Sequence, residues 1–185
     1  MPKEFDVPSG EGLRSVRLSE EGSEVTMQIV DYVPDRIQQK DLDTDELLTW
    51  PDGSPKWSTL VVCYVTAGDG AVGPRTAPEP LNPTELVSLW CDGARHYPWK
   101  DAYKKFRAEH GRNFAVGDVL HIVREEDTPP KKAAWSPQQN WKMTLRPPET
   151  EQERQTADLC ERLNSEREQD QRAFNHVPGD EEEAF

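Results

Sequence analysis

The residues best suited to chemistry form a turn with a tryptophan at each end, Trp-Pro-Asp-Gly-Ser-Pro-Lys-Trp at residues 50–57. Pro51 presets φ for a turn, Asp52 can hydrogen-bond to its own backbone, and Gly53 can supply a positive φ. Lys56 places one positive charge at the exit of the turn. Indole rings stack on bases and ammonium groups hold phosphates, so this turn is typical of a surface that binds single-stranded nucleic acid. The alternative is that both tryptophans close a small satellite core under the loop.

Two extended runs must position this turn. Ser58–Ala67 is rich in Val, Tyr and Thr and is apolar on both faces, which predicts a curved or central strand. Before the turn, Glu24–Lys40 is a longer extended run whose first ten residues alternate between apolar and polar, and Pro34 bends or ends that alternation. The two runs therefore predict a long β-ribbon whose tip carries two indoles and a lysine.

The rest of the chain up to residue 148 supplies three more strands and a helix. In order, these are a strand over Glu85–Cys91, a helix over Trp99–His110 that Gly111 caps, and strands over Val119–Arg124 and Trp141–Leu145. The order of three strands, a helix and two strands is that of the OB-fold, a partly open barrel. We therefore predict a mainly β chain, folded as a five-stranded OB-fold barrel with one helix between strands three and four.

An OB-fold builds its ligand face from strands two and three, flanked by the loops that join strands one to two and four to five. Here those loops are Lys40–Trp57 and Glu125–Asn140, and both hold tryptophan and lysine. The stacking candidates are Trp50, Trp57 and Trp135, with Tyr64 a weaker one. The candidate phosphate contacts are Lys56, Arg124, Lys131, Lys132 and Lys142. Three further tryptophans are assigned mainly to the core, namely Trp90, Trp99 and Trp141.

The chain divides into an arm, one domain and a charged end. Residues 1–11 are polar with Pro and Gly, which predicts a flexible arm. Residues 12–148 form the predicted domain, in which Gly12–Leu18 is a candidate short strand and Gly68–Pro83 a long loop rich in Gly, Pro and Ala. Residues 149–185 predict a solvated helix or a flexible linker, followed by a flexible acidic tail.

The net charge of −13 first argues against nucleic acid, but the charge is unevenly distributed. Residues 149–185 hold 12 acids and four arginines, a net of −8, which leaves −5 for residues 1–148. Residues 129–148 contain no acid and four bases, and residues 95–107 hold five bases against one acid. Because a phosphate backbone responds to local charge, the second half of the domain remains a candidate surface.

The composition also indicates which cellular compartment to expect and whether to expect a metal or cofactor. The three cysteines are far apart, odd in number and without Cys-x-x-Cys spacing, which predicts reduced thiols in a cytoplasmic protein with no metal site. No apolar run approaches the roughly 18 residues of a membrane helix, and the N-terminus lacks a signal-peptide core. We expect no membrane association and no cofactor.

Several of these features resemble the OB-fold single-stranded DNA-binding proteins of bacteria and tailed phages, over about residues 24 to 146 plus the last seven. The Trp-Pro-Asp-Gly-Ser-Pro-Lys turn after Gln38 and Gln39, and the late run Val-Gly-Asp-Val-Leu-His-Ile, are similar to phage members. The chain ends on Asp-Glu-Glu-Glu-Ala-Phe, which looks like the acidic, Phe-terminated tip of that family. Bacterial members usually have Pro before the final Phe, so Ala184 fits the phage type better.

The resemblance implies a protein that binds single-stranded DNA without sequence preference, protects it, and recruits replication or recombination proteins. The recruiting tip would be Asp180, Glu181, Glu182, Glu183 and Phe185. The tip could also lie in the basic groove and compete with weak ligands. An acidic end that serves only solubility is the simpler alternative. The implied location is the cytoplasm of a bacterial host cell, and family members range from monomers to tetramers, so a homo-oligomer stays open.

Other function classes have less support. The four histidines are scattered, no carboxylate is paired with a nucleophile, and no Gly-rich phosphate loop is present, so we expect no enzyme and no catalytic residue. The main rival is an OB-fold protein-interaction module, either a phage adaptor or a DNA-mimic inhibitor. A mimic would line the ligand face with acids such as Asp41, Asp43, Asp45 and Glu46. RNA binding would rely on the same base stacking and the same phosphate contacts, and it remains a third alternative.

Overall fold

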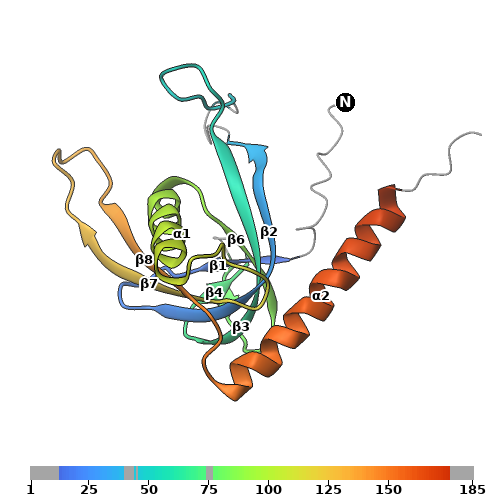
Figure 1. The fold of residues 1–185 in the computed structure, drawn as a ribbon. Helices are drawn as coiled ribbons and strands as arrows, with labels where there is room; N and C mark the ends of the chain where they lie inside the picture. The colour runs from blue at the N-terminus through green and yellow to red at the C-terminus, as the bar shows by residue number, and fades with distance from the viewer. Residues whose placement is uncertain (1–12, 40–43, 45, 74–76, 176–185) are drawn as a thin grey trace, which may run out of the picture.

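A single sheet with two α-helices forms the body of the molecule (Figure 1). The computed structural model describes residues 13–39, 44, 46–73 and 77–175. Its strands are β1 (Arg14–Arg17), β2 (Glu24–Gln38), β3 (Trp57–Gly68), β4 (Ala71–Val72), β5 (Glu79–Pro80), β6 (Leu86–Trp90), β7 (Val119–Thr128) and β8 (Gln138–Arg146). A short 3-10 turn, η1 (Gly93–Arg95), leads into α1 (His96–His110), and α2 (Glu151–Asn175) follows the last strand.

The five predicted main strands all form as β2, β3, β6, β7 and β8, and the predicted helix lies between the third and fourth of them. Gly111 ends α1 in the left-handed conformation with φ of 64°, as predicted for a cap. The β2 strand runs past Pro34 to Gln38, with an irregular register between Val33 and Ile37. The chain is therefore mainly β, as expected.

The prediction of a five-stranded barrel is wrong. The sheet has eight strands in the order β5-β4-β1-β6-β3-β2-β7-β8, and it does not close. Closure would require β6 to pair with β8, but β6 pairs in parallel with β1 instead, with Arg14 opposite Val87. Two short strands form within the predicted loop after β3, and Arg14 makes ion pairs with Glu79 and Glu85 at this end of the sheet. These contacts give β6 a neighbour other than β8, so the sheet stays open.

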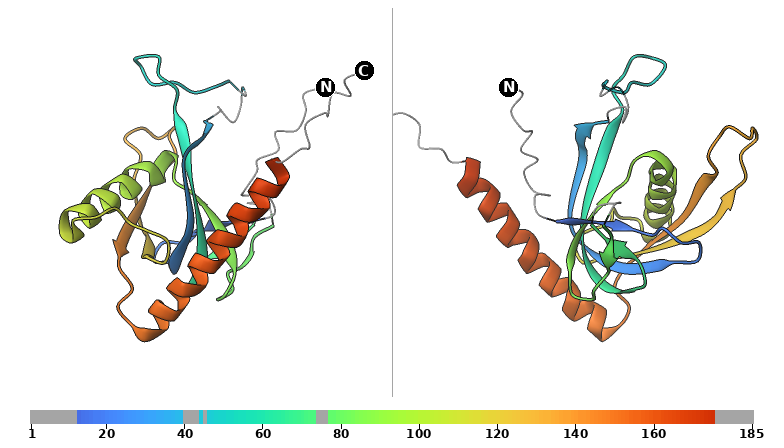
Figure 2. Two further views of the ribbon diagram at one scale, coloured as in Figure 1. Left: turned by 45° about the vertical axis from the view of Figure 1, so that its right-hand side comes forward. Right: turned by 180° about the vertical axis from the view of Figure 1, so that it is seen from behind.

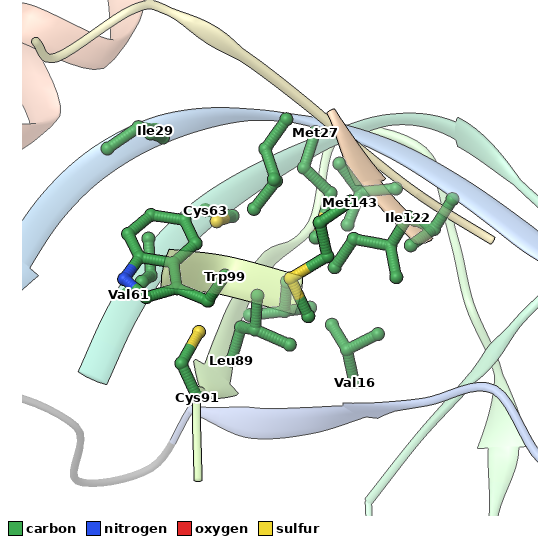
Figure 3. Close-up of a cluster of buried hydrophobic side chains, with 14 of the residues drawn as sticks. Val16, Met27, Ile29, Val61, Cys63, Leu89, Cys91, Trp99, Ile122 and Met143 are labelled. Atoms are coloured by element: carbon green, nitrogen blue, oxygen red, sulfur yellow. The ribbon is translucent and has the colours of Figure 1, made fainter. Parts of the chain in front are cut away.

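The main core fills the concave side of the sheet, under α1. Alternate residues of β2 and β3, such as Met27, Ile29, Val61 and Cys63, pack there against Trp99 from α1 (Figure 3). The other buried side chains labelled in that view are Val16, Leu89, Cys91, Ile122 and Met143. Trp141 is also buried, and Trp90 is half-buried, in line with their assignment to the core. The three cysteines, Cys63, Cys91 and Cys160, are free and buried.

A second apolar cluster covers the other face of the same strands. Val30, Leu60 and Val62 pack there with Cys160 of α2, and Leu163 lies against them. The β3 strand is thus buried on both faces, which agrees with its apolar sequence and its central place between β6 and β2. Burial raises the pKa of the Cys160 thiol to about 12, so this thiol stays protonated and packs as an apolar group.

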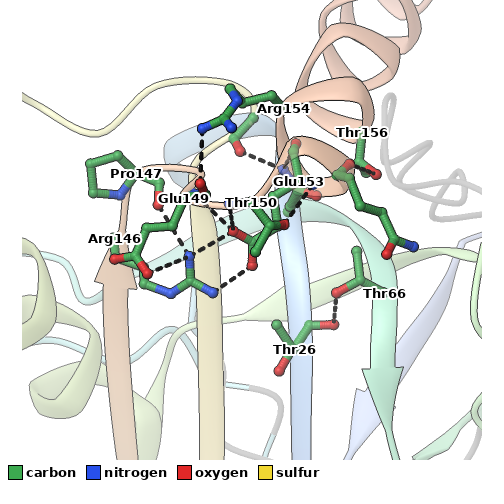
Figure 4. A network of polar contacts seen from close by, with 12 residues as sticks. Thr26, Thr66, Arg146, Pro147, Glu149, Thr150, Glu153, Arg154 and Thr156 are labelled. Atoms are coloured by element: carbon green, nitrogen blue, oxygen red, sulfur yellow. Dashed lines mark hydrogen bonds and ion pairs between the residues drawn. The ribbon is translucent and has the colours of Figure 1, made fainter.

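The α2 helix is anchored at its first turn (Figure 4). Thr150 Oγ1 accepts a hydrogen bond from the Glu153 backbone N–H at 3.1 Å, and Glu153 Oε2 accepts from the Thr150 N–H at 3.1 Å. This reciprocal pair is a capping box. The same carboxylate accepts from Arg146 at the end of β8, at 2.9 Å. The α2 helix packs on the sheet as far as Arg167, which pairs with Asp31 of β2 at 3.9 Å, whereas its last turns extend away from the sheet (Figure 2).

The anchor at Glu153 predicts a pH-dependent stability. The hydrogen bond from Arg146, with help from the backbone N–H groups of Glu149 and Thr150, lowers the pKa of Glu153 from 4.5 to about 2. A lowered carboxyl pKa stabilises the fold above the unfolded value and loses that effect as pH falls toward the folded value. Replacing Glu153 by Gln should lower the free energy of unfolding by about 1–2 kcal/mol at pH 7. The difference from the native chain should shrink as pH falls from 4.5 toward 2.

Urea unfolding at neutral pH and at several lower pH values measures this effect. Glu151→Gln is the matched control, because Glu151 lies in the same turn, is 74% exposed, and contacts only the exposed side chains of Arg154 and Gln155 on its own helix, among the described residues. A Glu153→Gln penalty that is independent of pH, or equal to that of the control, would show that the ion pair does not anchor α2.

Candidate nucleic-acid interface

The ribbon tip has the local chemistry that its sequence predicts. The ladder between β2 and β3 extends to the pair Gln38–Trp57. Beyond it, Gly53 has φ of 84° and donates its N–H to the Trp50 carbonyl at 2.9 Å. Asp52 Oδ1 accepts from the Ser54 N–H at 2.9 Å, which is the backbone bond expected of an Asp in a turn. The turn is therefore fixed by its own sequence and holds its tryptophans at the end of the β2–β3 ribbon.

Trp50 belongs to a small cluster of aromatic and cationic side chains. The Lys56 Nζ lies 4.7 Å from the centre of the Trp50 ring, and the ring of His96 lies 6.3 Å from it. Tyr97 follows, with its ring 5.1 Å from that of His96. Together with Gln39 and Gly93, these residues line a recess of about 180 Å³. None of its six lining residues is an acid: Lys56 supplies a positive charge, the rings of Trp50, His96 and Tyr97 supply aromatic surface, and Gln39 and Gly93 complete the lining.

Both tryptophans of the turn keep accessible surface. Trp50 is 38% exposed and Trp57 is 42% exposed, so neither indole is fully enclosed under the loop. Side chains alternate along β3, so Trp57 points to the same side of the ribbon as Val61, the side on which α1 packs. The ribbon tip thus offers two indoles that a ligand can reach.

The hairpin between β7 and β8 repeats the same pairing of lysine and indole. Lys132 Nζ lies 5.0 Å from the centre of the Trp135 ring, and Trp135 is 56% exposed. Lys131, which precedes Lys132 in the sequence, and Lys142 on β8 are also exposed. In Figure 1, α1 lies between this hairpin and the β2–β3 ribbon, and the view from behind in Figure 2 agrees. The two loops singled out by the sequence therefore flank one helix.

A groove lies along α1, on the side that faces β8. It has a volume of about 450 Å³ and runs between α1 and residues 141–145 of β8. Tyr97 lines both this groove and the recess at the ribbon tip, and it is 61% exposed. The groove carries two lysines, Lys105 and Lys142, and two acids, so its own charge is balanced. Its lysines and the exposed lysines of the two hairpins supply the positive charge along this path.

Two sequence candidates lie away from this surface. Arg124 is only 2% exposed, forms an ion pair with Asp127, and lies 5.3 Å over the Trp141 ring. Its positive charge is therefore compensated by Asp127 within the protein, and Arg124 is not part of the proposed interface. Tyr64 is half-buried against the second apolar cluster, on the face opposite α1.

Some residues of the sequence prediction lie outside the described residues. The acidic tip, Asp180 to Phe185, is among them, as are Asp41, Asp43 and Asp45 of the DNA-mimic alternative. Glu46 is described and is exposed, but it does not line the recess.

Four of the six residues that line the recess were not predicted as site residues, namely Gln39, Gly93, His96 and Tyr97. His96 and Tyr97 were placed before the helix, which was predicted to begin at Trp99. Pro98 is the signal that could have corrected this, because proline is accepted in the first turn of a helix and marks its start. Gln39 was noted only as part of the ribbon, and its Nε2 donates to the Trp57 carbonyl at 3.0 Å.

No family model, curated protein or solved structure matches this chain. Within the part of the chain that the structure describes, no helix is long and apolar enough to cross a membrane. The same residues contain no group of three or more His, Cys, Asp or Glu side chains that could hold a metal ion. A functional assignment must therefore be made from the geometry of the recess, the groove and the two hairpins.

Proposed function

We propose that this protein binds single-stranded DNA without sequence preference. The observation that carries the proposal is the repeated lysine–indole pair, Lys56 with Trp50 and Lys132 with Trp135, on two hairpins that flank α1. A base stacked on an exposed aromatic ring contributes about 1–3 kcal/mol whatever its identity. Lysines add a salt-dependent term by releasing counterions from the phosphates. The DNA would run from the ribbon tip over Tyr97 and along the groove to the second hairpin.

We also propose that the sheet is an open variant of the OB-fold. The order β6-β3-β2-β7-β8, with α1 between β6 and β7, supports this reading. The loops that flank the ligand in OB-folds, between strands one and two and between four and five, correspond here to the two lysine–indole hairpins. One difference follows from α2, which packs on the outer face of the central strands. The proposed path therefore lies on the α1 side, between the hairpins.

Direct binding assays test this function. Fluorescence anisotropy with labelled oligo-dT, a duplex of equal length and oligo-rU should show tight binding of the single-stranded DNA and weak binding of the duplex. Preferential binding of oligo-rU would assign the same surface to RNA. If no nucleic acid binds, the protein-interaction module becomes the better assignment, and the lysine–indole pairs would then face a protein.

The acidic tip is proposed to recruit replication or recombination proteins rather than to hold DNA. Cutting the chain after Pro178 removes four acids and the terminal Phe185. The truncated chain should bind oligo-dT with unchanged or higher affinity, because a competitor for the positive surface is gone. Anisotropy titrations of the two chains at low salt measure the change. A second variant with Glu181, Glu182 and Glu183 changed to Gln separates charge from length, and a large loss of affinity in both chains would contradict this role.

A further inference from the structure

The recess at the ribbon tip has the size of a site for one planar ring. Its volume of about 180 Å³ is smaller than the roughly 300–1,000 Å³ of sites for drug-sized ligands. It is bounded by side chains from two separate parts of the chain, the ribbon with Gln39, Trp50 and Lys56, and the start of α1 with His96 and Tyr97. Gly93 adds no side chain, and a Cβ at this position would meet no atom within 4 Å. The recess is therefore not closed off on its Gly93 side.

The walls of the recess match the parts of a nucleotide. The Trp50 indole offers a stacking surface, and the half-exposed Lys56 beside it can neutralise a phosphate. The Gln39 amide is held by its bond to the Trp57 carbonyl, which leaves its own carbonyl oxygen as an acceptor for an N–H on a base edge. His96 offers ring nitrogens that can also form hydrogen bonds. Groups that can stack on a base, hydrogen-bond to its edge and hold its phosphate thus lie together in the recess.

Lys56 has a particular role in the unliganded protein. Its ammonium lies over the Trp50 ring at 4.7 Å, where a cation–π contact keeps that face of the indole covered. A base that stacks on this face must displace the ammonium, which then becomes available for the adjoining phosphate. The ion that covers the ring in the free protein therefore becomes a ligand contact in the complex.

We propose that the recess binds a single nucleobase, turned out of the strand, with its phosphate held by Lys56. This inference rests on the proposed binding of single-stranded DNA and adds one defined position to it. The other bases stack loosely on exposed rings, whereas this one sits between the ribbon and α1. One position of the bound strand should therefore be more sensitive to loss of its base than the positions beside it.

Photo-crosslinking locates this base. A series of oligo-dT strands, each with one thymine replaced by 5-iodouracil, is bound to the full chain, irradiated and mapped by mass spectrometry. One position should give adducts on Trp50, His96 or Tyr97. Adducts found only on Trp57 or Trp135 would overturn the recess as a base site, although DNA binding would stand. A chain that binds none of the strands would instead refute the proposed function itself.

An affinity measurement gives a second, independent readout. Tyr97 lines the recess together with Trp50, and we expect its ring to contact the base as well. Tyr97→Ala should therefore weaken binding of intact oligo-dT by about 5- to 150-fold, the range for one stacked base. The same variant should cause little further loss on a strand that is abasic at the crosslinked position, because the contact is already gone. Tyr97 is 61% exposed, so its removal spares the core, and the exposed Lys100 provides a control substitution on the same helix. If Tyr97→Ala lost the same factor of affinity for the intact strand and for the abasic strand, the proposal would be contradicted.

Discussion

Replacing Trp57 and Trp135 together by alanine should weaken binding of oligo-dT by about 2–6 kcal/mol, since each ring stacks one base. The two indoles sit on different hairpins and are 42% and 56% exposed, so neither supports the core. Their contributions should be nearly additive, because the residues share no contact in the structure and act on different bases. Anisotropy titrations of the two single variants and of the double variant measure the effect.

Leu47→Ala is the matched control for the tryptophan variants. Leu47 is 56% exposed, as is Trp135, and lies in the same segment as the ribbon turn, but it has no ring to stack. Its loss should leave DNA affinity unchanged. A double tryptophan variant that keeps its circular dichroism spectrum and melting temperature, and still binds DNA normally, would show that these rings are not the stacking platform.

Replacing Lys56, Lys132 and Lys142 together by alanine should change the salt dependence of binding. For single strands, the slope of log K against log salt is about −0.7 for each phosphate neutralised, so the triple variant should have a slope shallower by about 2. The affinity loss should be largest at low salt and should shrink as salt rises. Titrations at four or more salt concentrations give the slope.

The chain offers a control with the same change of charge on a neighbouring surface. Lys100, Lys104 and Arg107 are exposed on α1 but do not line the groove. Their replacement by alanine removes three positive charges and should reduce affinity slightly while leaving the slope unchanged. If both triple variants change the slope equally, the overall charge of the protein attracts the DNA. The lysines on the proposed path would then contribute no more than other exposed bases.

The local elements of this fold could be predicted from the sequence, because local chemistry determines them. The ribbon turn follows from Pro51, Asp52 and Gly53, and the end of α1 follows from Gly111. The inward positions of Trp141, Met143 and Leu145 on β8 follow from their alternation with polar residues. Each of these features depends on residues within a few positions of each other.

The openness of the sheet could not be predicted in the same way. It depends on the pairing of β1 with β6, whose partners Arg14 and Val87 lie more than 70 positions apart. A short strand carries little sequence signal of its own, and its partner is chosen by packing. Arg124 shows the same limit, because its place on a strand did not reveal that Asp127 and Trp141 would enclose it.

The position of α2 was only half predictable. Its length and charge predicted a solvated helix or a linker, and its later turns do extend from the body (Figure 2). The start of the part that packs on the sheet has a signal that could have been used, since Thr150 and Glu153 have the spacing of a capping box. The ion pair of Glu153 with Arg146 and the burial of Cys160 are tertiary contacts, which no local pattern specifies.

A tryptophan-fluorescence titration tests the central claim most directly, because three of the six tryptophans, Trp50, Trp57 and Trp135, lie on the proposed surface. The protein is titrated with oligo-dT and, separately, with a duplex of equal length, at low and at moderate salt. We expect strong quenching by the single strand only, at concentrations that rise with salt. No quenching by either ligand, or equal quenching by both, would contradict the assignment of this surface to single-stranded DNA.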